Sequence, residues 1–85
     1  MCLLKNKERK NMYCTIERNN YVFVHEDDGR LVRKIIVNGQ VESAYMNGTD
    51  KVAITYAANS NVNPPLRYTE LWDVSGRLIR RTSCR

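Results

Sequence analysis

The sequence predicts an all-β fold: a small antiparallel meander of six to seven strands, either barrel-like or a strongly twisted sheet. Short runs rich in β-branched and aromatic residues recur along the 85-residue chain. Turn signals such as Asp28-Gly29 and Asn38-Gly39 separate these runs. No segment carries apolar residues at helical spacing over the length that a stable helix needs. A chain of this length forms one domain with a single modest core.

The first strands follow from alternation and turn chemistry. Residues 12–17 alternate between two faces, which is typical of a half-buried strand. Residues 21–26 are apolar on both faces, so we expect a central or doubly covered strand there. A turn at Gly29 leads into residues 30–37. The Asn38-Gly39 pair then predicts a two-residue hairpin turn into a fourth strand.

Three further strands complete the predicted meander. Residues 51–58 alternate cleanly, with small alanines on their second face. Residues 59–65 read as a polar loop stiffened by a proline pair. Residues 67–74 and 77–84 make a last hairpin around Gly76. The predicted core residues are Ile16, Val22, Val24, Val32, Ile36, Val41, Tyr45, Val52, Ile54, Tyr56, Leu71, Trp72 and Ile79.

Residues 1–11 are predicted to be a flexible basic arm, and residues 12–85 a single all-β domain. The arm contains a charged run without periodicity. Two interpretations of this run remain: it is solvated, or it contacts phosphates. No apolar run is long enough to span a membrane, and the first residues do not form a signal peptide. We therefore expect a cytoplasmic protein.

Cysteine and histidine usage argues against both a disulfide scaffold and a metal site. The chain has three cysteines and one histidine, with no Cys-x-x-Cys pair. If the first and last strands pair as in a barrel, Cys14 and Cys84 should lie close together. His25 has no serine or cysteine partner in a recognisable catalytic arrangement. The four glycines stand in separate turns rather than in one phosphate-binding loop. We expect no enzyme and no cofactor.

The segment around Gly29 is echoed around Gly76. Both read acid-x-x-Gly-Arg-Leu-aliphatic-basic-basic, which predicts two hairpins of one design. Residues 71–78, Leu-Trp-Asp-Val-Ser-Gly-Arg-Leu, resemble the closing strand and turn of a WD-type propeller repeat. The stretch through Thr82 is also similar to the Tyr-Asp-x-x-Gly-Arg-Leu pattern of large shell-forming toxin repeats. A propeller needs more blades than this chain supplies, so the resemblance implies hairpin chemistry and no function.

The expected function is that of a small binding module, and two classes of partner remain open. The first is a protein: an adaptor or inhibitor domain that pairs through a sheet edge, with another protein or with itself as a homodimer. The alternative is nucleic acid, which a formal net charge of +5 permits. Such a charge also serves solubility alone.

Two basic hairpins would carry the nucleic-acid alternative. If they lie on one side of the fold, their cations share a surface, with aromatic residues between them as stacking platforms. Otherwise the cations are solvent-facing residues that discourage pairing at strand edges. The predicted residues for binding nucleic acid or an acidic partner are Arg30, Arg33, Lys34, Arg77, Arg80 and Arg81, and the predicted aromatic contacts are Tyr13, Tyr68 and Trp72.

Overall fold

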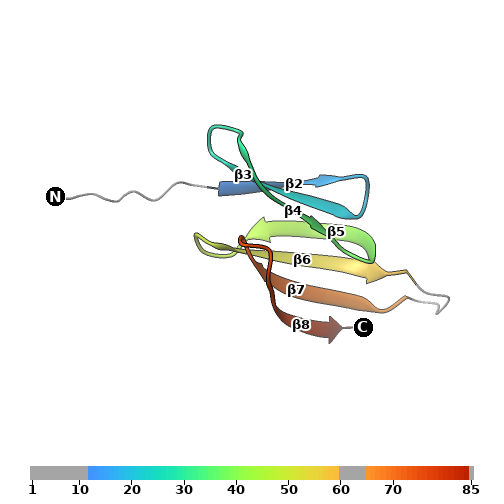
Figure 1. The fold of residues 1–85 in the computed structure, drawn as a ribbon. Helices are drawn as coiled ribbons and strands as arrows, with labels where there is room; N and C mark the ends of the chain where they lie inside the picture. The colour runs from blue at the N-terminus through green and yellow to red at the C-terminus, as the bar shows by residue number, and fades with distance from the viewer. Residues whose placement is uncertain (1–11, 60–64, 85) are drawn as a thin grey trace.

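The computed structural model describes residues 12–59 and 65–84, which form β-strands joined by turns (Figure 1). The predicted arm at residues 1–11 and most of the predicted loop lie outside the described residues. The described strands are β2 (Met12–Glu17), β3 (Tyr21–Glu26), β4 (Leu31–Ile36), β5 (Gly39–Met46), β6 (Lys51–Ala58), β7 (Arg67–Asp73) and β8 (Leu78–Cys84).

The strands form two antiparallel sheets, which confirms the predicted all-β meander. Sheet I has three strands in the order β2-β3-β4, and sheet II has four in the order β5-β6-β7-β8. Sheet I lies above sheet II in Figure 1, and strand β2 runs beside β5. Among the described strands, β8 pairs only with β7, so the sheets do not close into a barrel.

One core lies between the inner faces of the two sheets. Val22 and Val24 of β3 and Val52 and Ile54 of β6 are all 0% exposed, and Tyr56 is 3% exposed. These side chains belong to a single cluster that draws on both sheets. Burying each aliphatic side chain of this size contributes about 1.5–3 kcal/mol, so the shared cluster is what holds the sheets together.

The chain crosses from sheet I to sheet II at Gly39, and the hairpin predicted there is wrong. Strands β4 and β5 do not pair. Instead, the Val37 N–H donates to the carbonyl of Asn20 at 3.0 Å, and the Val41 N–H donates to that of Asn19 at 2.5 Å. Gly39 is buried, and a Cβ there would collide with the Ala57 carbonyl. Only glycine therefore fits where the chain changes sheets.

Three β-bulges change which side chains face the core. One lies between Val24 and His25, so that Val24 pairs with Arg33 and Ile35 turns inward in place of Ile36. The others interrupt the β5–β6 and β7–β8 ladders. A slip of one residue moves every later side chain to the opposite face. The bulged strands β4, β5 and β8 accordingly expose the predicted core residues Ile36, Tyr45 and Ile79.

The predicted core is confirmed where the ladders run without interruption. Ile16 is also exposed, because it lies near the end of the edge strand β2. Buried as predicted are Val22, Val24, Val41, Val52, Ile54 and Tyr56; partly buried are Val32, Leu71 and Trp72; buried but not predicted are Ile35, Val37 and Ala53.

Cys14 and Cys84 lie on strands that do not pair. Cys14 is in β2 of sheet I, and Cys84 ends β8 at the far edge of sheet II. The expected proximity of the two rested on barrel closure, which the structure lacks. Cys14 is a free, half-buried thiol, and burial raises its pKa. We therefore expect it to react slowly with alkylating reagents at neutral pH.

Candidate binding surfaces

The predicted basic residues are divided between the two faces of each sheet. Lys34 pairs with Phe23 on the outer face of sheet I, whereas Arg33 pairs with Val24 on the inner face. Arg80 is on the outer face of sheet II and Arg81 on its inner face, opposite Glu70. Arg30 and Arg77 belong to the two hairpin turns. The hairpins therefore do not bring all six cations together.

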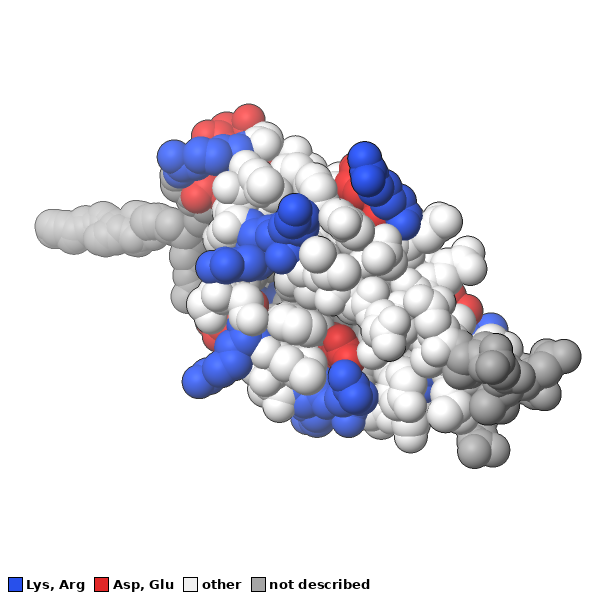
Figure 2. All heavy atoms as spheres, turned by 45° about the vertical axis from the view of Figure 1, so that its right-hand side comes forward, with Lys and Arg blue, Asp and Glu red and all other residues white. Residues whose placement is uncertain are grey.

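Several of these cations are bound within the molecule. Arg30 donates to Glu26 at 2.7 Å, and this hydrogen bond raises the pKa of Arg30. Arg33 donates to the Val74 carbonyl at 3.2 Å and lies against Gly76, so it ties β4 to the β7–β8 turn. Figure 2 shows the basic side chains of one face in separate patches, several of them beside acidic side chains.

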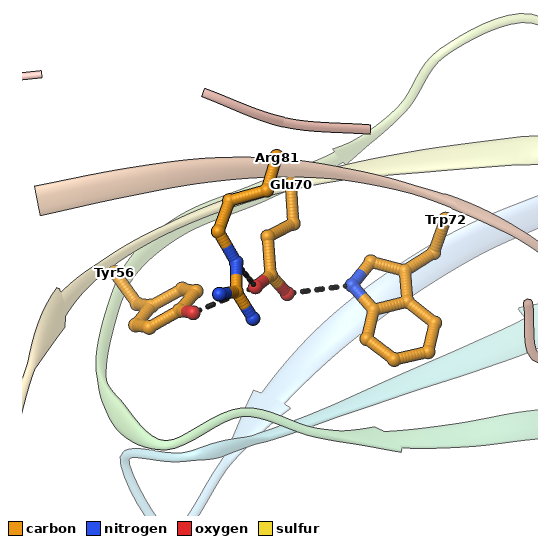
Figure 3. Close-up of polar contacts among 4 residues, drawn as sticks. All are labelled: Tyr56, Glu70, Trp72 and Arg81. Carbon is orange, nitrogen blue, oxygen red and sulfur yellow. Dashed lines mark hydrogen bonds and ion pairs between the residues drawn. The ribbon is translucent and has the colours of Figure 1, made fainter. Parts of the chain in front are cut away.

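Glu70 of β7 is a carboxylate in the core of sheet II, only 2% exposed. Three donors surround it (Figure 3): the Tyr56 hydroxyl donates to Oε2 at 2.7 Å, the Trp72 indole N–H to Oε1 at 2.8 Å, and Arg81 Nε to Oε2 at 2.8 Å. Burial first, and the bond to Glu70 second, raise the pKa of Tyr56 to about 12. Such bonds compensate the cost of burying the charge.

Three of the residues predicted to contact a partner, Tyr68, Trp72 and Arg81, make contacts within the molecule, at or beside Glu70. Trp72 and Tyr68 pack against the core, and the guanidinium of Arg81 lies 5.3 Å from the centre of the Tyr68 ring. Within the described residues, no group of three or more His, Cys, Asp or Glu side chains is placed to hold a metal ion. The hydrogen bonds of Glu70 link β7 to both of its neighbours, β6 and β8.

Strand β8 is the most exposed of the strands that the structure describes. Each residue from Leu78 to Ser83 is exposed, whichever face it occupies. One edge of β8 pairs with β7, and no other described strand pairs with its second edge. Among the described residues, the large hydrophobic side chains exposed at the surface all lie on sheet-edge strands: Tyr13 and Ile16 on β2, Leu31 and Ile36 on β4, Tyr45 on β5, and Leu78 and Ile79 on β8.

The outer face of sheet I carries a group of aromatic rings, which we call the aromatic face: Tyr13, Tyr21, Phe23 and His25. Tyr13 is the one predicted aromatic contact that lies there, stacked on His25 with ring centroids 4.9 Å apart. Strand β3 is central, as predicted, but no described strand packs on its outer face. The sequence did signal this face, since β3 alternates aromatic residues with valines.

The part of the chain that the structure describes contains no helix able to span a membrane. Comparisons with protein-family models, with curated proteins and with solved structures each found no match to this chain.

Proposed function

We propose that this chain is a non-enzymatic protein-interaction module that self-associates by pairing β8 with β8 of a second copy. The exposure of β8 on both faces carries the proposal. A strand at the edge of a sheet presents a row of unpaired backbone N–H and C=O groups, which is a template for adding another strand. Pairing across a two-fold axis gives each copy the same interface.

Charge selects the register of this pairing. A two-fold axis perpendicular to the sheet pairs residues of the same face, so it passes beside one residue of β8 and not between two. The residues in the middle of β8 are Arg80, Arg81 and Thr82. The first two place identical cations directly opposite each other, which destabilises a strand pair. Centring at Thr82 sets Arg81 opposite Ser83 of the second copy. The arginine is moreover already bound to Glu70. We therefore place the axis at Thr82.

The test compares two variants with the same added charge. In Thr82→Lys, two lysines would face each other across the axis, and we expect the dimer Kd to rise about fivefold, which corresponds to about 1 kcal/mol. Thr49→Lys lies in the exposed β5–β6 turn and should leave the Kd unchanged. Sedimentation equilibrium over a range of concentrations measures both, with circular dichroism to verify folding.

The wild-type chain should shift from monomer to dimer mass as its concentration rises, with weak affinity because one short edge buries little surface. A wild-type chain that stays monomeric at every concentration contradicts the proposal. So does an equal effect of the two lysine variants. The nucleic-acid alternative based on the two basic hairpins has less support, because the register places Arg33 and Lys34, and likewise Arg80 and Arg81, on opposite faces.

A further inference from the structure

We propose that the aromatic face of sheet I binds single-stranded nucleic acid, with unpaired bases stacked on its rings and phosphates held by Lys34 and Arg18. This site is separate from the β8 edge, and it uses only one of the six predicted cations. Two observations carry the proposal: a row of half-buried rings on a sheet face that no described strand packs against, and a pocket beside that row in which cations outnumber acids.

The rings form a continuous row along β3. Tyr21, Phe23 and His25 occupy alternate positions on the outer face, with centroid separations of 6.3 Å for Tyr21–Phe23 and 6.2 Å for Phe23–His25. Tyr13 of β2 extends the row by stacking on His25 at an interplanar angle of 19°. The Thr15 hydroxyl lies 3.1 Å from His25 Nε2 and fixes the orientation of that ring. Aromatic rings on a small sheet stack successive bases without sequence preference.

A pocket of about 470 Å³ lies at one end of this row. Its lining consists of Glu17, Arg18, Tyr21, Phe23 and Lys34. The Lys34 ammonium is 5.5 Å from the centre of the Tyr21 ring, and Arg18 enters from the β2–β3 turn, where its φ is 53°. Two cations face one carboxylate here, so the pocket favours an anionic ligand. Phosphates beside stacked bases meet both requirements.

Double-stranded nucleic acid does not fit this chemistry. The base faces of a duplex are stacked inside it, so rings on the surface of a sheet cannot reach them. We therefore expect binding of a single strand and not of a duplex of the same length. The probes are a fluorescein-labelled oligothymidine and a labelled duplex, with fluorescence anisotropy as the readout.

Matched variants locate the binding. Phe23→Leu removes the central ring but keeps an apolar side chain, and should weaken oligothymidine binding about tenfold, since each base stacked on a ring contributes strongly. Its control, Tyr45→Leu, removes an exposed ring from sheet II and should change nothing. Lys34→Gln should lower the slope of log K against log salt by about 0.7, as loss of one phosphate contact to a single strand does. Arg80→Gln should leave that slope unchanged.

Several results would overturn this proposal: no binding of oligothymidine, equal binding of the duplex, or a wild-type affinity in folded Phe23→Leu. Loss of affinity in Arg80→Gln but not in Lys34→Gln would assign the binding to the β7–β8 hairpin of sheet II instead. Thr82→Lys separates this proposal from self-association, because it should weaken the dimer about fivefold and still bind oligothymidine. Lys34→Gln keeps the test decisive if Phe23→Leu fails to fold.

Discussion

At the scale of single residues, Glu70 shows how a charge is accommodated in a small core. Its carboxylate accepts bonds from Tyr56, Trp72 and Arg81, which come from three different strands. A buried ion pair of this kind adds little net stability, but the loss of one partner leaves a charge or a dipole unsatisfied. The bonds therefore fix the arrangement of the surrounding side chains more than they strengthen the fold.

Tyr56 gives this cluster a pH dependence. Its pKa is raised from 10.0 to about 12, so folding favours the neutral phenol. The stabilisation is fully present below pH 10 and is lost as the pH rises through 12. We expect Tyr56→Phe to cost about 1.5 kcal/mol at neutral pH, because it removes a hydrogen bond to a charged group. The difference in urea midpoint between wild type and variant should shrink over that alkaline range.

The control for this prediction is Tyr45→Phe, which alters a tyrosine that is 57% exposed. Its urea midpoint should follow that of the wild-type protein at every pH. A Tyr56→Phe difference that stays constant through the alkaline range would show that the phenol is not held neutral by its surroundings.

At the scale of elements, the bulge in the β3–β4 ladder decides which isoleucine is in the core. Ile35 is 2% exposed and Ile36 is 52% exposed. Ile35→Ala should therefore lower the free energy of unfolding by about 3 kcal/mol through the cavity that it leaves. Ile36→Ala should change it by no more than about 0.5 kcal/mol. Urea denaturation measures both, and equal losses would show that the strand is in the other register.

The sequence predicts the strands of this fold far better than their registers. Turn chemistry at Gly29 and Gly76 is local, and each of these glycines has a positive φ in its predicted turn. A bulge depends on the partner strand as well, and strict alternation therefore misplaced Ile36 and Tyr45. The hairpin predicted from the Asn38-Gly39 pair is wrong for a related reason. It is typical of a hairpin, but packing of Gly39 against β6 overrides that preference.

At the scale of the whole molecule, both sheets depend on one core and should unfold together. Val24 lies in sheet I, and the chain's single tryptophan, Trp72, reports on sheet II. Val24→Ala should cost about 2 kcal/mol and lower the urea midpoints of tryptophan fluorescence and of circular dichroism equally. Leu31→Ala, an exposed change in the same sheet, should lower neither. An unchanged fluorescence midpoint in Val24→Ala would mean that the sheets unfold independently.

The location of the candidate sites is also a property of the whole molecule. The sequence correctly predicts that Arg33, Lys34, Arg80 and Arg81 lie on strands. The sheet face on which each of them lies depends on the bulges and on the crossing between the sheets. The indole N–H of Trp72 donates to Glu70, a carboxylate whose burial no local pattern indicates. Tyr68 packs against the core beside the ring of Tyr56. The aromatic face was not predicted, because apolar residues on both faces of β3 indicate a central strand or one covered on both faces.

The order of the strands has a consequence for the time course of folding. Every hydrogen-bonded pair of described strands joins neighbours in the sequence. The loop-closure entropy of each hairpin is therefore small, and the hairpins can form early. The slow event is then the docking of the two sheets. During synthesis, sheet I emerges first, and Val22 and Val24 stay uncovered until β6 follows. That interval is when a nascent chain is most prone to aggregate.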